Sequence, residues 1–175
     1  MAETKKKITV NLQVKEIVFD VQNKAYLTGH SREADQKKNY QAASDMQASD
    51  DVENSYQIRR SIATAFSSVK SLLGEYLSSD KTTSDNKIAK EIDSDGVLSL
   101  EFLLPSNYNQ ASADSLGNNL HAYLVDMALS DWFAITDPED AQTYIQHSAI
   151  CLENARRALY KRSRPTRPTY TEAGA

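Results

Sequence analysis

The chain has 175 residues, of which 40% are apolar and 25% are charged, as is typical of a globular protein of one domain. It contains no apolar run near the ~20 residues that cross a bilayer, so we expect no transmembrane helix. No signal-peptide pattern opens the sequence, and Cys151 is its one cysteine. We therefore expect a protein that is made in a cytoplasm and has no internal disulfide.

The net charge of -4 conceals an uneven distribution along the chain. Residues 8–155 hold 11 Lys and Arg against 22 Asp and Glu, whereas both ends are basic. We interpret Lys5 to Lys7 as charges that keep a terminal arm solvated. The C-terminal cations are Arg156, Arg157, Lys161, Arg162, Arg164 and Arg167. An acidic body with basic ends suits head-to-tail contact between copies, or contact with an acidic partner.

The first predicted elements are a short strand and a helix that follows it directly. Residues 8–14 alternate between apolar and polar side chains, which is typical of a strand. Apolar residues then recur at helical spacing as far as Gly29, which stands where a helix C-cap is expected. The alternative is a β-hairpin that turns near residues 22–24. Residues 31–49 are polar, and we interpret them as an exposed helix capped by Ser31 or as a mobile loop.

The clearest helical pattern begins at Val52, after the start signal Ser49-Asp50-Asp51, and ends at the polar run of residues 78–86. Its expected buried face comprises Val52, Tyr56, Arg59, Ile62, Phe66, Val69, Leu73, Tyr76 and Leu77.

A turn at Asp95-Gly96 introduces a second predicted strand, which Pro105 ends. The next helix is expected to close at Trp132-Phe133. Its expected apolar face comprises Leu116, Leu120, Tyr123, Leu124, Met127 and Ala128.

The dipeptide Asp137-Pro138 predicts the start of the last helix, because an N-cap residue is followed by proline at the first helical position. We expect Pro165 to end this helix. The short connection predicts that the last two helices are antiparallel neighbours. The expected buried face of the last helix comprises Ala141, Tyr144, Ile145, Ser148, Leu152, Ala155 and Leu159.

These patterns predict a mainly α protein: a small bundle of three to four helices, with one or two short β-strands and an extended basic C-terminal tail. We divide the chain into a basic N-terminal arm (1–7), a helical domain (8–161) and the tail (162–175). The helical domain contains polar insertions near residues 31–50 and 78–95.

The sequence contains no recognisable catalytic or cofactor-binding motif, so we expect a protein that is not an enzyme. His147 and Cys151 point the same way on the last helix, but two donors are too few for zinc. We interpret them as an ordinary helix face. Asp93, Asp95 and Gly96 resemble the opening of a calcium loop, but the glycine comes too early. We interpret the acidic clusters as solvated turns and helix caps, and predict no metal and no cofactor.

The basic C-terminal run is the strongest functional signal in the sequence. Pro165 and Pro168 favour extended backbone between them. An extended segment with several guanidinium groups can lie in a groove of another protein and pair with carboxylates. Nucleic acid would accept the same charges, although the acidic body opposes it and no recognition helix is evident. A protein partner is the leading interpretation. The alternatives are a small nucleic-acid-binding protein that acts through this segment, and a tail that is only solvated.

Four stretches of the chain carry a family resemblance. They are IVFDVQNKAYLTGHSR, VLSLEFLLPSNY, LHAYLVDMALSDWF and ARRALYKRSRPTRP. Together they resemble the head–tail connector (adaptor or neck ring) proteins of tailed bacteriophages, particularly crAss-like phages of Bacteroides-type hosts. The resemblance covers residues 14–168, with residues 31–50 and 78–95 as variable insertions.

The resemblance implies a structural virion protein, made in the bacterial host cytoplasm and located in the neck at the portal vertex, with no membrane contact. It implies a homo-oligomeric ring, commonly of twelve copies, whose partners are the portal protein and other neck or tail ring proteins. DNA would pass through the ring without specific binding, which carboxylates lining a channel favour. Residues 159–168 would form the portal-docking segment. The implied partner-binding residues are Leu159, Tyr160, Arg162, Arg164, Pro165, Arg167, Pro168 and Tyr170.

Overall fold

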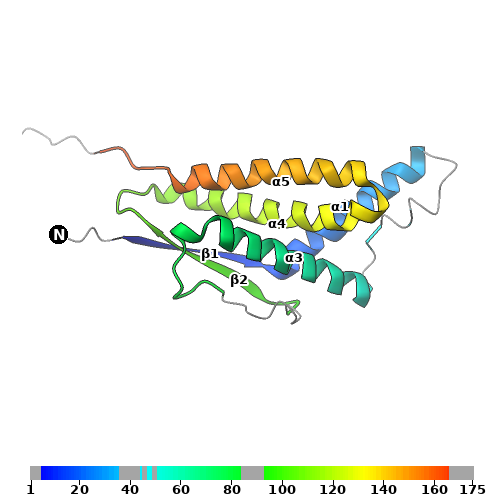
Figure 1. Cartoon of the computed structure of the whole chain (residues 1–175), viewed down its shortest axis with the longest axis horizontal. Coiled ribbons are helices and arrows are strands. Elements are labelled where there is room, and N and C mark those ends of the chain that lie inside the picture. Colours follow the sequence, from blue (N-terminus) through cyan, green and yellow to red (C-terminus); the bar gives the residue numbers. More distant parts are fainter. Residues whose placement is uncertain (1–4, 36–43, 45–46, 49–50, 84–92, 166–175) are drawn as a thin grey trace, which may run out of the picture.

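The computed structural model describes residues 5–35, 44, 47–48, 51–83 and 93–165, with the backbone alone at 32–35. Its strands and helices are β1 (Lys6–Gln13), α1 (Val14–Asp35), α3 (Val52–Leu72), β2 (Val97–Leu104), α4 (Ala113–Thr136) and α5 (Pro138–Leu159), with short 3₁₀ turns at η1 (Gly74–Tyr76) and η2 (Gln110–Ser112). In Figure 1, α4 and α5 lie one above the other, α3 crosses in front, and the strands run along the lower side. The predicted small helical bundle with short strands is confirmed.

Both predicted strands are present, and they pair with each other. β1 and β2 are antiparallel, in a register that runs from Lys6 opposite Leu104 to Gln13 opposite Val97. The alternation that predicted the strands reflects burial, because Ile8, Val10 and Leu12 of β1 are buried while their odd-numbered neighbours are exposed. The sheet therefore has one face on the core, and helices cover that face.

A third segment lies along the outer edge of β2, although it forms no regular strand. Leu77 forms an isolated bridge with Phe102, and the Ser78 N–H donates to the Glu101 carbonyl at 2.7 Å. Ser78 is buried. The first residue of the region that we described as a polar insertion is thus hydrogen-bonded to the edge of the sheet.

Helix α4 is the centre of the fold, since it contacts α1, α3, α5 and β1. Its buried residues occur all round the helix: Leu116, Leu120, Tyr123, Leu124, Val125, Asp126, Ala128, Leu129, Ser130 and Phe133. Gly117 faces the sheet, and a Cβ there would be in ordinary van der Waals contact with Val10 Cγ1 at 3.6 Å. Truncating Leu120 or Leu124 to alanine should cost about 2–5 kcal/mol, as is usual for buried leucines. The helix ends at Thr136, three residues beyond the predicted end.

Helix α5 begins as the sequence predicts. The Asp137 carboxylate accepts the N–H groups of Glu139 and Asp140, both at 3.1 Å, and Pro138 occupies the first turn. Such a cap stabilises a helix by about 1 kcal/mol. The predicted antiparallel packing of α5 on α4 is also confirmed. The buried face is partly different, since Cys151 and Ala158 are buried while Ile145 is 44% exposed.

The prediction for the end of α1 was wrong. Helix α1 continues through Gly29, which is buried and has no positive φ, so it is not a C-cap. Gly29 only weakens a helix by about 1 kcal/mol, and good helix formers follow it. Ser31 does not cap a new helix, because it lies inside α1 and its hydroxyl donates to the Thr28 carbonyl at 2.8 Å. The alternative hairpin near residues 22–24 is excluded, since those residues are helical. Most of the predicted segment 31–49 lies outside the described residues.

Helix α3 begins after Asp51, as predicted, and the Asp51 side chain makes no cap hydrogen bond. The helix ends at Leu72, earlier than the predicted end at residues 78–86, and the 3₁₀ turn η1 follows it. Ser49 and Asp50, the other two residues of the start signal, lie outside the described part of the chain. The buried residues of α3 are Ile58, Ile62, Ala65, Phe66 and Val69. Val52 is 81% exposed, against expectation, because the first turn of α3 borders an open cleft of about 520 Å³ beside Val18 and Phe19 of α1.

Candidate functional site

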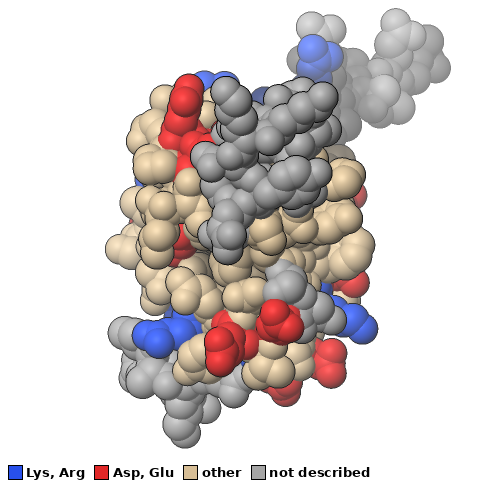
Figure 2. All heavy atoms as spheres, turned by 90° about the vertical axis from the view of Figure 1, so that its right-hand side faces the viewer, with Lys and Arg blue, Asp and Glu red and all other residues tan. Residues whose placement is uncertain are grey.

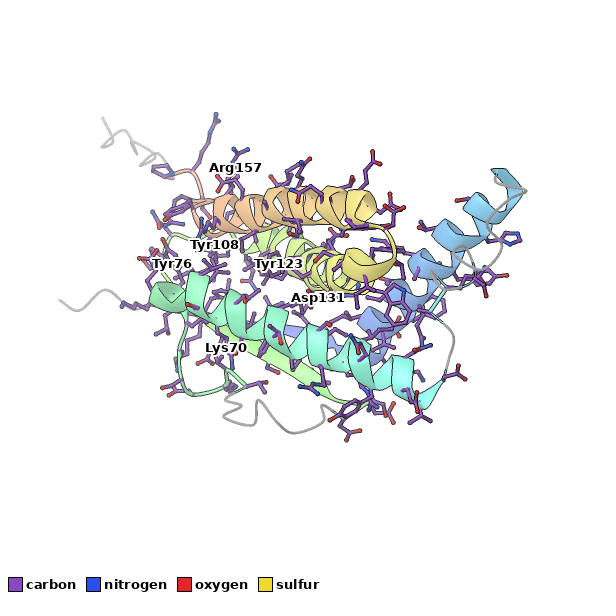
Figure 3. The ribbon with its side chains drawn as sticks, turned by 45° about the vertical axis from the view of Figure 1, so that its right-hand side comes forward. Lys70, Tyr76, Tyr108, Tyr123, Asp131 and Arg157 are labelled. Carbon is purple, nitrogen blue, oxygen red and sulfur yellow. The ribbon has the colours of Figure 1, made fainter. Side chains whose placement is uncertain are left out.

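The chain after α5 is held by hydrogen bonds against the loop that follows β2. These contacts are Asn109 N–H to the Lys161 carbonyl (3.1 Å), Ser163 N–H to the Asn107 carbonyl (2.8 Å), and an isolated antiparallel bridge between Tyr108 and Arg162. We call residues 160–165 the clamped segment. It leaves the body at the end of the molecule where Figure 3 labels Tyr76, Tyr108 and Arg157.

This pairing corrects the prediction for the end of α5. The helix ends at Leu159, with Tyr160 as its C-cap, and not at Pro165. Continuing the helix would carry Lys161 and Ser163 away from the loop that they pair with. The helix therefore ends six residues before the proline.

Arg162 stabilises the end of α5 as well as carrying charge. Its Nη1 donates to the carbonyl of Leu159 at 2.8 Å and to that of Lys161 at 3.3 Å. The Leu159 carbonyl belongs to the last helical residue, where intrahelical partners are missing and the helix dipole is negative. Part of the predicted docking charge thus serves the helix itself.

The predicted docking residues fall into three groups. Leu159 is 1% exposed and belongs to the core, so it is not on the surface. Tyr160 is 58% exposed, and its hydroxyl forms a hydrogen bond with that of Tyr76, which raises the pKa of the Tyr76 phenol. Arg162, Arg164 and Pro165 are exposed. The remaining predicted residues, Arg167, Pro168 and Tyr170, lie outside the described residues.

A polar cleft of about 320 Å³ lies beside the clamped segment, between the start of α4 and the end of α5. Its lining combines hydroxyl and amide side chains with two cations and one alanine: Ser112, Ser115, Asn119, Asn154, Arg157, Ala158 and Lys161. Arg157 is also paired with Glu153 at 3.2 Å, one turn earlier on α5. Donors of this kind suit a carboxylate, because Arg, Lys, Ser and Asn can all donate to its oxygens. The cleft therefore extends the cationic surface of the clamped segment.

The opposite end of the molecule is more acidic. Helices α3 and α5 both begin there (Figure 1), and their first turns or caps carry Asp51, Glu53, Glu139 and Asp140. Figure 2, which faces this end, shows acidic side chains at the upper left and along the lower margin, where basic side chains lie at either side. The uneven charge of the sequence thus becomes a difference between the two ends of the folded chain.

A second group of polar residues lies between α4 and α5. His147 and Cys151 point the same way on α5, as predicted, and the structure adds Asp126 of α4. The Asp126 Oδ2 lies 2.6 Å from His147 Nδ1 and 3.8 Å from Cys151 Sγ, and Lys24 Nζ lies 3.5 Å from Asp126 Oδ1. Burial raises the pKa of the Cys151 thiol, and the nearby carboxylate raises it further. Asp126 was not among the predicted residues, although a carboxylate within the apolar run 123–129 was a usable signal.

This group does not have the geometry of a catalytic triad. The ring nitrogen of His147 that meets Asp126 is Nδ1, and the contact to Cys151 Sγ, at 3.9 Å, is made by the same atom. A relay needs the carboxylate and the nucleophile on different ring nitrogens. A raised thiol pKa also disfavours the thiolate that would act as nucleophile. The three donor atoms could instead hold a metal ion, since all lie within 4.8 Å of one another.

His121, which was not among the predicted residues, and the turn at residues 93–96 have structural roles. His121 Nε2 lies 2.8 Å from Asp20 Oδ2, which joins α4 to α1. The Gly96 N–H donates to the Asp93 carbonyl at 3.0 Å and closes the turn before β2. Asp93 and Asp95 are exposed, as expected for a solvated turn.

Comparison of the chain with protein-family models, with curated proteins and with solved structures gave no match. Among the helices that the structure describes, none has the length and apolar character needed to cross a membrane.

Proposed function

We propose that this protein is a structural assembly subunit, and specifically a connector in a virion neck that forms a ring and docks onto a portal protein through its clamped segment. The observation that carries the proposal is the clamp itself. Two backbone hydrogen bonds hold the clamped segment on the domain, so the backbone that carries Lys161 and Arg164 has a defined position. A segment whose backbone is already held in place loses less conformational entropy when it binds a partner.

The chemistry of the surface favours an acidic protein as the partner. The cations of the clamped segment adjoin a cleft in which hydroxyl and amide donors surround Arg157 and Lys161. Carboxylates can pair bidentately with guanidinium groups and accept from the neighbouring donors. The acidic body disfavours the phosphate backbone of DNA, which agrees with a channel that DNA traverses without being held.

Ring formation is proposed from the difference between the two ends. The acidic first turns of α3 and α5 and the basic last turn of α5, with Arg156 and Arg157, could meet between neighbouring copies, which leaves the clamped segment for the portal. Contacts between unlike surfaces generate closed rings when the rotation between copies permits closure. The copy number that we propose, twelve, comes from the connector resemblance.

The experiment compares two charge-reversal pairs of equal size. Lys161→Glu/Arg164→Glu changes the clamped segment, and Lys15→Glu/Lys81→Glu changes exposed lysines elsewhere. Arg162 is left intact because it stabilises α5. With the portal protein of the same virus, we expect the first pair to lose binding by at least tenfold, about 1.4 kcal/mol, and the control pair to retain it. Equal binding by both pairs would refute the docking role.

Two further measurements address the ring and the alternative function. Native mass spectrometry of the full chain with the portal should give a ring, and a monomer under all conditions would refute ring formation. Binding to duplex DNA should be weak at low salt. Tight binding that falls steeply with salt and is lost in Lys161→Glu/Arg164→Glu would instead establish a nucleic-acid-binding protein.

A further inference from the structure

Three side chains with metal-binding atoms converge where α4 packs on α5, far along α5 from the clamped segment. They are Asp126 of α4 and His147 and Cys151 of α5. Asp126 and Cys151 are buried, with 1% and 5% of their surfaces exposed. The side chain of His147 is 58% exposed, so one side of the group faces solvent.

The spacing of the donor atoms is close to that of a tetrahedral zinc site. Zinc binds sulfur at about 2.3 Å, and nitrogen and carboxylate oxygen at about 2.0–2.2 Å, so neighbouring donors are separated by about 3.2–3.6 Å. Here Oδ2 and Nδ1 are 2.6 Å apart, while Sγ lies 3.8 Å from Oδ2 and 3.9 Å from Nδ1. Adjustments of less than about 1 Å in each separation would give the tetrahedral spacing.

The buried carboxylate supplies an independent reason for a cation at this point. Asp126 Oδ1 is buried and has no hydrogen-bond partner among the described residues. The cation nearest to it is Lys24, whose Nζ lies 3.5 Å away and whose side chain is 43% exposed. A buried carboxylate is costly unless it is paired and hydrogen-bonded, or coordinates a metal. The carboxylate is thus only partly compensated by the protein.

We propose that Asp126, His147 and Cys151 bind a zinc ion, with water in the fourth position. The combination of thiolate, imidazole and carboxylate suits zinc better than the oxygen-only preference of calcium or magnesium. Binding converts the Cys151 thiol to a thiolate and releases its proton to solvent. Zinc with a thiolate, a carboxylate and a neutral imidazole has no net charge, so the occupied site is suited to a partly buried position.

The ion would join α4 to α5 at a point remote from the docking segment, and the site does not depend on the proposed function. Lys24 competes with the metal for Asp126, because its ammonium group lies next to the same carboxylate. The half-exposed lysine can turn into solvent when zinc binds. Because of this competition, removing the Lys24 ammonium group should have different effects on a zinc site and on a network of ion pairs that needs no metal.

The test uses the full chain, freed of metal with a chelator and titrated with Co²⁺ and then Zn²⁺. We expect one Co²⁺ per chain, a thiolate-to-cobalt absorption band, intense visible bands of a tetrahedral centre, and displacement by Zn²⁺. Cys151→Ser and His147→Gln should each weaken binding by more than about 100-fold, since even outer partners of metal ligands are worth 10–100-fold. The matched control is His121→Gln, which removes another His–Asp pair and should leave binding unchanged.

Lys24→Met separates the two explanations. If the site binds zinc, removing the competing ammonium should strengthen zinc binding by about tenfold. If the group is only an ion-pair network, the same variant should lower the melting temperature and bind no metal. Absence of a cobalt–thiolate band, a dissociation constant for Zn²⁺ weaker than about 10 µM, or a band that survives Cys151→Ser would overturn the proposal.

Discussion

Thr83 and Ser99 form two hydrogen bonds with each other across the outer edge of β2. The Thr83 N–H donates to the Ser99 carbonyl at 2.8 Å, and the Ser99 N–H donates to the Thr83 hydroxyl at 2.9 Å. The neighbouring Thr82 hydroxyl accepts the Glu101 N–H at 3.1 Å in the same way. Side-chain oxygens therefore take the place that carbonyl groups of a third strand would occupy. The exposed edge of β2 is closed without a regular strand.

Removing the Thr83 hydroxyl should destabilise the sheet. Thr83→Val keeps the shape of the side chain but leaves the Ser99 N–H without its acceptor, so we expect a loss of about 1–2 kcal/mol in the free energy of unfolding. Chemical denaturation measures the change. Thr83→Ser retains the oxygen and should lose less than half as much. Equal losses in the two variants would show that the hydroxyl is not the stabilising group.

Successive residues of β1, at the other edge of the sheet, differ in whether their N–H group is hydrogen-bonded to β2, and proline substitutions can test this difference. The Val14 N–H donates to the Gly96 carbonyl at one end of the β1–β2 ladder. In an antiparallel ladder every second residue pair exchanges hydrogen bonds, and counting from Val14 and Gly96 these pairs include Val10 with Leu100. The N–H of Thr9 therefore points away from β2, along a cleft of about 700 Å³ between β1 and the first turns of α4. The polypeptide should tolerate proline at one position and not at the other.

We expect Val10→Pro to cost at least about 3 kcal/mol, because it removes a ladder hydrogen bond and a buried side chain. Thr9→Pro removes an N–H that is not in the ladder and should cost much less, about 1 kcal/mol from backbone restriction. Thermal unfolding followed by circular dichroism compares the two. Equal destabilisation by both prolines would mean that Val10 and Thr9 do not differ in this way in their hydrogen bonding to β2.

The parts of the fold that depend on nearby residues could be predicted from the sequence. Asp137-Pro138 specifies the start of α5 because the cap and its N–H partners lie within three residues. Alternation within β1 and β2 likewise reports the burial of each strand. The pairing of the two strands could not be predicted, since it joins residues such as Ile8 and Phe102 whose contact depends on the whole core.

The candidate sites show the same dependence on distance along the chain. The basic run after α5 was evident, but its attachment to residues 107–109 depends on where β2 ends in space. Pro165 appeared to end the helix because proline is a strong local signal, and a more distant pairing ended it earlier. The spacing of His147 and Cys151 was visible, whereas Asp126 joins them only when α4 packs on α5.

The ion pair between Lys7 and Asp80 predicts a dependence of stability on pH. Lys7 Nζ lies 2.7 Å from Asp80 Oδ2, and this hydrogen bond holds the pKa of Asp80 below its ordinary value of 3.8. A carboxyl whose pKa is lowered by folding stabilises the protein above its unfolded pKa, and the contribution is lost as the pH falls through the folded pKa. Wild type should thus be more stable than Asp80→Asn at neutral pH.

The difference in melting temperature between wild type and Asp80→Asn should vanish when the pH falls well below 3.8, because Asp80 is then neutral in both states. High salt at neutral pH should reduce the difference as well, since both side chains are more than half exposed. Melting curves from about pH 7 to about pH 2 measure this dependence. A difference that persisted in acid would show that the effect of Asp80→Asn is not electrostatic.

The last prediction concerns the hydroxyl of Tyr108, beneath the clamped segment. Tyr108 is 1% exposed, and its hydroxyl has no hydrogen-bond partner among the described residues. Burial raises the pKa of this phenol, and the charge of Arg162 partly opposes the shift. An unpaired buried hydroxyl is unfavourable, so Tyr108→Phe should leave stability unchanged or raise it by up to about 1 kcal/mol.

The matched comparison is Tyr76→Phe, which removes a hydroxyl that is hydrogen-bonded to Tyr160 and should lose up to about 1 kcal/mol. Urea denaturation of the two variants and the wild type would show opposite directions of change. A loss of more than about 1 kcal/mol in Tyr108→Phe would mean that the hydroxyl has a partner after all. Because Tyr108 pairs through its backbone with Arg162, the same variant should leave the clamped segment in place, and the proposed portal binding should be unchanged.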